Sequence, residues 1–124
     1  MELEKDEKII KKHYEFCNAS RNLGFVINDK LYSGIKINLT NKRFYVEPVS
    51  KLLNKIMPLL PGAILDLRLK DVNNYSVEYV WNILGEIPRV AINYKDNQKF
   101  SFCTSKKDLK EWESKFLELS IPKK

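Results

Sequence analysis

The sequence predicts an α+β fold in which antiparallel strands form most of the chain and a C-terminal helix packs on them. Three observations support this prediction. Apolar and polar residues alternate over several short runs, which is the pattern of half-buried strands. Turn-forming residues separate these runs at close spacing, which favours hairpins over the long crossovers of a parallel sheet. The last run changes to helical spacing before Pro122.

Size and composition predict a single folded domain over residues 1–124. Hydrophobic residues make up 44% of the chain and aromatic residues 11%, too many for a disordered protein. No run of about 18 apolar residues occurs, and the N-terminus is charged throughout, so we expect neither a transmembrane segment nor a secretory signal. Two cysteines in an ordinary composition favour a reducing, cytoplasmic setting, with peripheral membrane attachment as an option.

The first segment has the spacing of an amphipathic helix. Four apolar residues fall on one helical stripe: Leu3, Ile10, Tyr14 and Cys17. Charged residues occupy most other positions. We therefore expect a helix over residues 3–18, within an N-terminal helical region 1–20 that ends before Gly24.

The next segments read as strands joined by tight turns. A short apolar run over residues 25–27 is followed by a turn at Asn28 and Asp29. From Gly34 to residue 46, the apolar residues predict a hairpin with its turn at residues 41–42. Because alternate side chains of a strand point to opposite faces, Lys36 and Asn38 are expected on the open face of this hairpin.

Further strands follow a less regular middle region. Residues 50–57 read as a short helix or turn, and residues 65–69 alternate as a strand with one wet face. Residues 75–83 fit a strand better than a helix because β-formers dominate and Val77, Tyr79, Trp81 and Ile83 alternate with other residues. Residues 90–94 and 99–103 form a second hairpin.

The final element is a helix with a bulky apolar stripe. Thr104 or Ser105 is expected to cap it, and Pro122 to stop it. Its stripe consists of Leu109, Trp112, Phe116 and Leu119. Such a stripe packs against a sheet, so we expect six or seven strands to curl into a half-open barrel that this helix plugs.

Several strings resemble pleckstrin-homology-like domains of the bacterial or GRAM type. These are residues 34–46 (GIKINLTNKRFYV), 67–72 (LRLKDV) and 90–102 (VAINYKDNQKFSF), with Trp112 in the closing helix. The resemblance spans residues 24–119 and implies a half-open barrel capped by the C-terminal helix. It also implies a binding scaffold without a shared catalytic residue, because such domains bind phosphoinositides, other lipids or protein partners.

The net charge of +6 is concentrated in one region. Residues 21–55 hold seven basic and two acidic residues, whereas both predicted helical ends are nearly balanced. A local excess of this kind points to an anionic partner, although solvated lysines on a soluble surface explain it as well. The resemblance places basic residues of the first hairpin at the ligand site, so the candidate ligand-binding residues there are Lys30, Lys36, Lys42 and Arg43. Lys51 and Lys55 are further candidates because they flank the apolar stretch 51–60, an arrangement that suits a membrane interface.

Catalytic and metal-binding constellations are sparse. His13 is the only histidine, and Cys17 and Cys103 are interpreted as small buried residues. No glycine-rich phosphate loop occurs among the four glycines. We therefore expect no enzyme activity and no cofactor or metal.

The sequence is interpreted as a non-catalytic binding module that presents its basic hairpin to a protein partner or an anionic lipid surface. The apolar stretch 51–60 is either core or a second interaction surface. The alternative is a basic nucleic-acid-binding protein, in which Tyr32, Phe44, Tyr45 and Tyr94 would offer stacking surfaces. The oligomeric state is left open.

Overall fold

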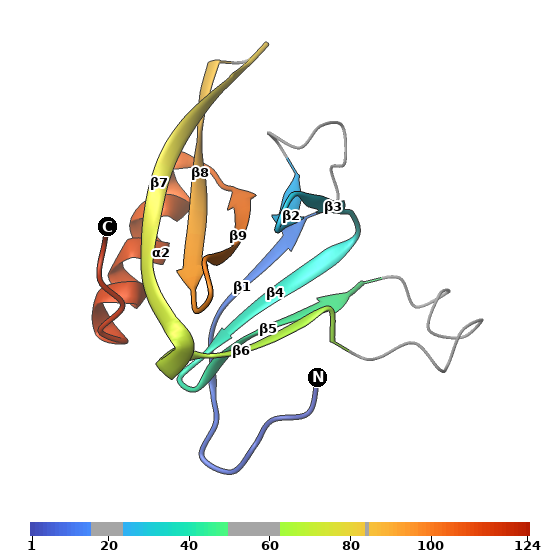
Figure 1. Ribbon diagram of the computed structural model, residues 1–124, viewed down its shortest axis with the longest axis vertical. Coiled ribbons are helices and arrows are strands. Elements are labelled where there is room, and N and C mark those ends of the chain that lie inside the picture. The colour runs from blue at the N-terminus through green and yellow to red at the C-terminus, as the bar shows by residue number, and fades with distance from the viewer. Residues whose placement is uncertain (16–23, 50–62, 84) are drawn as a thin grey trace, which may run out of the picture.

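Two antiparallel sheets and one helix make up the described part of the fold (Figure 1). The computed structural model describes residues 1–15, 24–49, 63–83 and 85–124, and the structural statements below refer to these residues. The α+β class and the predominance of antiparallel strands are confirmed. The short helix or turn predicted over residues 50–57 and the apolar stretch 51–60 lie outside the described residues.

The first sheet has the strand order β1-β4-β5-β6. Its strands are β1 (Ile9–Glu15), β4 (Ile35–Thr40), β5 (Arg43–Pro48) and β6 (Leu65–Arg68). The predicted hairpin of residues 34–46 is confirmed as β4 and β5, in register from Leu39 opposite Phe44 to Ile35 opposite Pro48. Alternation buries Ile37, Leu39 and Phe44 completely on the inner face.

The second sheet has the order β3-β2-β9-β8-β7. Its strands are β2 (Phe25–Ile27), β3 (Lys30–Tyr32), β7 (Val72–Asn82), β8 (Gly85–Tyr94) and β9 (Gln98–Cys103). Two of its hairpins turn on residues with positive φ, Asn28 and Asp29 in one and Asp96 and Asn97 in the other. This backbone conformation suits two-residue hairpin turns, which explains why asparagine and aspartate occupy them. The predicted strand over residues 75–83 and the late hairpin are confirmed.

The helix α2 (Lys106–Glu118) closes one side of the core, as the sequence predicts. Ser105 caps it, because its Oγ accepts the Asp108 amide at 3.1 Å. Trp112 is completely buried, and its ring lies 5.1 Å from Phe102 and 5.7 Å from Phe116. The helix therefore joins the aromatic core that the strands enclose.

The predicted N-terminal helix is wrong, because residues 9–15 form strand β1 beside β4. Alternation turns Lys11, His13 and Glu15 toward the interior face, opposite the core residues of β4. The Lys11 ammonium lies 5.3 Å above the Trp112 ring and 2.8 Å from a Glu111 carboxylate oxygen. The methylene chain of Lys11 therefore covers apolar surface while its ammonium group pairs with Glu111. Because a hydropathy pattern counts lysine as exposed, it does not indicate a strand here.

Two further expectations about the sheets require correction. The strands form two separate sheets that do not close into a barrel, instead of one curled sheet of six or seven strands. Lys36 lies on the outer face of β4, as expected, but Asn38 is completely buried there. Its side-chain amide donates to the Tyr45 carbonyl and to Glu47, both at 3.1 Å.

Candidate functional site

The basic residues predicted to bind a ligand are dispersed in the structure. Lys30 begins β3 in one sheet, whereas Lys36 lies near the start of β4 in the other. Lys42 follows the far end of β4, roughly 15 Å or more from Lys36 at the rise of a strand. Lys30 and Lys36 lie 5.3 Å and 5.7 Å above the rings of Tyr32 and Tyr14. Lys51 and Lys55 lie outside the described residues.

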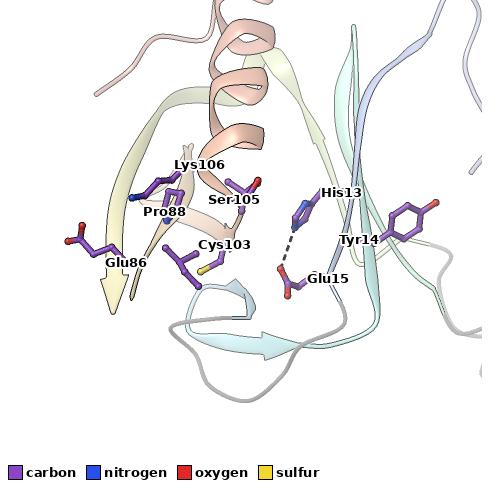
Figure 2. A pocket seen from close by; sticks show the side chains of 10 residues that line it. His13, Tyr14, Glu15, Glu86, Pro88, Cys103, Ser105 and Lys106 are labelled. Atoms are coloured by element: carbon purple, nitrogen blue, oxygen red, sulfur yellow. Dashed lines mark hydrogen bonds and ion pairs between the residues drawn. The ribbon is translucent and has the colours of Figure 1, made fainter. Parts of the chain in front are cut away.

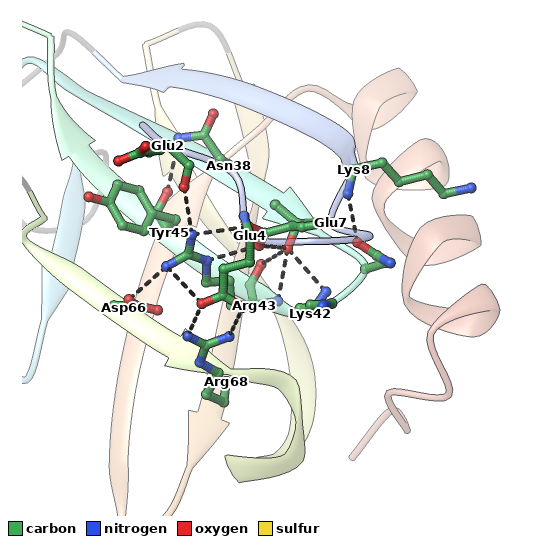
Figure 3. Close-up of polar contacts among 12 residues, drawn as sticks. Glu2, Glu4, Glu7, Lys8, Asn38, Lys42, Arg43, Tyr45, Asp66 and Arg68 are labelled. Atoms are coloured by element: carbon green, nitrogen blue, oxygen red, sulfur yellow. Dashed lines mark hydrogen bonds and ion pairs between the residues drawn. The ribbon is translucent and has the colours of Figure 1, made fainter.

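Arg43 is the most deeply placed of these cations, with only 5% of its surface exposed. Its guanidinium donates to both Glu7 carboxylate oxygens, at 2.9 and 3.0 Å, and to Asp66 at 2.9 Å (Figure 3). A further bond reaches the Glu2 carbonyl at 3.1 Å. The positive charge of Arg43 is therefore balanced within the chain, leaving few donors for an external phosphate.

Glu7 is the central acceptor of this network. Its side chain is completely buried and also accepts the Thr40 hydroxyl at 2.7 Å. Hydrogen bonds from Arg43 lower the pKa of the Glu7 carboxyl to about 2, against the opposing effect of burial. The carboxylate is thus held in its charged form at neutral pH.

The other N-terminal residues continue this network over the outer face of β4, β5 and β6. Glu4 forms a two-bond ion pair with Arg68 (Figure 3). The Lys5 carbonyl accepts a hydrogen bond from the Lys42 ammonium. The Arg68 guanidinium lowers the pKa of Glu4. The N-terminal carboxylates therefore offset part of the excess charge of residues 21–55, an effect that local charge counts do not show.

A pocket of about 530 Å³ opens between β1, β8 and the start of α2 (Figure 2). Its lining includes His13, Glu15, Pro88, Cys103, Ser105 and Lys106. His13 Nε2 lies 3.4 Å from a Glu15 carboxylate oxygen, and the imidazole lies 5.1 Å from the Phe102 ring. His13 thus packs against the aromatic core, and Ser105 caps α2 through its hydroxyl.

Cys103 contacts a neighbouring side chain, and the described residues contain no cluster of metal ligands. The Cys103 sulfur lies 3.6 Å from an Arg89 guanidinium nitrogen, and Arg89 also donates to the Ser101 hydroxyl at 2.8 Å. Within the described ranges, no three histidine, cysteine or acidic side chains gather closely enough to hold a metal ion.

The ribbon of β7 and β8 extends beyond the rest of its sheet (Figure 1). β9 pairs with β8 from Arg89 onward, and the Thr104 amide donates to the Pro88 carbonyl at 3.1 Å, so residues 85–87 pair with β7 alone. We call residues 79–83 and 85–88 the arm. Three large apolar side chains are exposed here, Tyr79 at 51%, Trp81 at 76% and Ile83 at 103%. The arm is therefore an apolar surface outside the core.

The apolar face of the arm continues the inner face of β7. Tyr75 is buried against Phe116, with ring centroids 4.6 Å apart, and Val77 packs on the core. Tyr79 and Trp81 follow on the same face because strand side chains alternate. Pro88 and Glu86 lie opposite them on β8 and also line the pocket. The stripe thus begins in the core and ends in solvent beside the pocket.

Sequence reasoning identified this alternation as a strand but did not single out the arm. The available signal was a period-two apolar stripe that continues to a hairpin tip. Two residues proposed for nucleic-acid stacking, Phe44 and Tyr94, are buried in the core. Tyr45 lies beneath Arg43, with the guanidinium carbon 4.8 Å from its ring centre.

Comparison of the chain with family models, curated proteins and solved structures gave no match. In the described part of the chain, no helix is long and apolar enough to cross a membrane.

Proposed function

We propose that this chain is a non-catalytic binding module of pleckstrin-homology-like architecture that binds a protein partner. The order of elements supports the architecture, with a meander of β4, β5 and β6, a meander of β7, β8 and β9, and a C-terminal helix closed by Trp112. Two of the strings that resemble these domains, residues 34–46 and 90–102, fall on the hairpins β4–β5 and β8–β9, and Trp112 lies in α2.

The observation that carries this proposal is the exposed apolar face of the arm. Large apolar side chains exposed together on one soluble surface are typical of interaction sites. Tyrosine and tryptophan are also the side chains that contribute most to protein interfaces, because each buries a large area at low entropic cost. Trp81 is therefore the expected anchor of the interface.

Charge favours a protein over an anionic lipid or a nucleic acid at this surface. The arm and the residue before it carry Glu78 and Glu86 and no lysine or arginine. Carboxylates repel phosphate groups, so Glu78 and Glu86 would oppose binding of the neighbouring apolar side chains to an anionic membrane or a nucleic acid. On the basic hairpin, Arg43 is already paired with Glu7 and Asp66.

Site-specific photo-cross-linking in cells tests the proposal. A photoreactive phenylalanine analogue replaces Ile83 at the arm tip in one variant and Leu117 on α2 in the control; both native residues are exposed. We expect a discrete adduct from position 83 that position 117 does not give. Trp81→Lys should abolish this adduct because it places a charge in the apolar face.

Binding to anionic vesicles and to single-stranded oligonucleotides distinguishes the rival functions. The double variant Lys36→Glu, Lys42→Glu is compared with the double variant Tyr79→Lys, Trp81→Lys. Salt-sensitive binding to either probe that only the first variant loses would replace our proposal with a lipid or nucleic-acid function. Equal adducts at positions 83 and 117 would also contradict it.

A further inference from the structure

We propose that the edge of β7 pairs antiparallel with β7 of a second copy of this chain, so that the two sheets join across a two-fold axis. This inference rests on the proposed function, because it names the partner of the arm. It follows from the backbone of the edge, the sequence along it and the charges beside it.

The outer edge of β7 offers unpaired backbone along most of its length. β7 is the terminal strand of its sheet (Figure 1). Tyr75 at this edge is bridged by Lys123. From Ser76 to Asn82, no described strand covers this edge. A row of open amide and carbonyl groups is a template for pairing with another strand.

The residues along this edge lack the features that keep edge strands apart. Lysine, proline and bulges serve this purpose in monomeric proteins. Between Ser76 and Asn82 there is neither lysine nor proline, and the register shift of β7 lies earlier, between Val72 and Asn74. The other edge strands differ, because β1 carries adjacent lysines, while β3 and β6 are short and carry charged residues.

The sequence of β7 is complementary to itself in antiparallel register. Pairing centred on Tyr79 places the two Tyr79 side chains opposite each other and Val77 opposite Trp81 of the second copy. Glu78 is the only charged residue between Ser76 and Asn82. In this register it lies opposite Val80 of the second copy, so the two Glu78 side chains are not opposed. The exposed apolar stripes of the two arms become one continuous surface, as expected of an isologous interface.

The contact is limited in size, which sets the expected strength. A short strand pair with a few aromatic side chains is much smaller than the 20–30 residues a side of an ordinary interface. We therefore expect a dimer that dissociates on dilution.

Sedimentation equilibrium of the full chain, from about 10 μM to about 1 mM, tests this inference. We expect the average mass to rise from monomer toward dimer across this range. Tyr79→Lys should hold the protein at monomer mass, because it opposes two lysines at the two-fold axis. Tyr79→Phe keeps the apolar contact and should still dimerise, and Leu117→Lys is the control for an added charge on an exposed residue of α2.

The fluorescence of Trp81 provides a second measurement. Trp81 is 76% exposed in one chain, whereas Trp112 is completely buried. The emission maximum should shift to longer wavelength on dilution in the native protein, and this shift should be absent in Trp81→Phe.

The outcomes separate this inference from the proposed function. A monomer at every concentration, together with a Trp81-dependent adduct to another protein, overturns the self-pairing and leaves the proposed function standing. Absence of both the dimer and the adduct overturns both. A dimer that Tyr79→Lys leaves intact also overturns the inference, because its interface then lies elsewhere.

Discussion

Replacing Glu7 with glutamine should destabilise the fold in a pH-dependent way. The substitution keeps the shape of the side chain but removes the charge that Arg43 and Thr40 bind at 2.7–3.0 Å. Arg43 would remain buried with one ionic partner fewer. Removing one acidic partner of a buried arginine is destabilising, because Asp66 alone then balances the charge of Arg43.

The pKa of Glu7 gives the magnitude. Lowering it from 4.5 in the unfolded chain to about 2 in the folded protein corresponds to about 3 kcal/mol by linkage. Arg43 keeps its ion pair with the partly exposed Asp66, which offsets part of this value, so we expect a loss of about 2 kcal/mol at neutral pH. In urea, this corresponds to a midpoint lower by roughly 1–2 M.

The pH dependence follows from the direction of the shift. Because folding lowers the pKa of Glu7, its stabilisation is complete above the unfolded pKa and disappears as pH falls through 4.5 toward about 2. The stability difference between the native protein and Glu7→Gln should therefore shrink between pH 5 and pH 2.

Urea unfolding followed by tryptophan fluorescence, at pH 7 and at pH 3, measures both effects. Glu111→Gln is the control, because Glu111 pairs with Lys11 at 2.8 Å but is largely exposed, and it should change stability far less. Equal stability of Glu7→Gln and the native protein at pH 7 would refute the reasoning. A stability difference that is the same at pH 3 as at pH 7 would refute the electrostatic part of it.

Three further predictions concern the helix and the core. Trp112→Ala should cost about 3–5 kcal/mol in urea unfolding because it empties a completely buried site; a loss below about 1 kcal/mol would contradict the packing. Ser105→Ala should cost about 1 kcal/mol by removing the cap on the Asp108 amide, whereas Ser105→Asp should retain most of the stability. Burial and then the Glu113 carboxylate, 2.7 Å away, raise the pKa of Tyr75 to about 12, so an ultraviolet titration should lose its step near pH 12 in Tyr75→Phe.

Elements with local signals were predictable from the sequence. The hairpin of β4 and β5 combines alternating residues with a two-residue turn, and both signals lie within a few positions of one another. α2 is similar, because its cap at Ser105 and its stripe through Trp112 follow directly along the chain. These elements require no knowledge of distant residues.

Strand β1 was not predictable, because its inward positions are polar. Lys11 and His13 face the aromatic core through a methylene chain and an imidazole ring, and the ends of both side chains find acidic partners. A hydropathy pattern records these residues as exposed. The same stretch meets a helical template by chance, and only pairing with β4 decides between the two structures.

The candidate site was only partly predictable for a related reason. Arg43 was correctly identified as part of a basic hairpin, but its counter-charges, Glu7 and Asp66, lie 36 and 23 positions away. Tyr79 and Trp81 alternate with other residues in the same way whether the strand is buried against the core or extends beyond it into solvent. Tertiary structure alone distinguishes these cases.

The pairing of β2 with β9 has a consequence for how the chain is made. Val26 pairs with Ser101, so the second sheet is complete only after residues 98–103 have been made. Lys11 likewise reaches Glu111 on the last helix. During synthesis, the early strands must leave the ribosome without their partners, and contacts of such long sequence separation slow folding. Translation of α2 is therefore the step that permits the native structure, and a chain truncated before Trp112 should remain a target for chaperones and proteases.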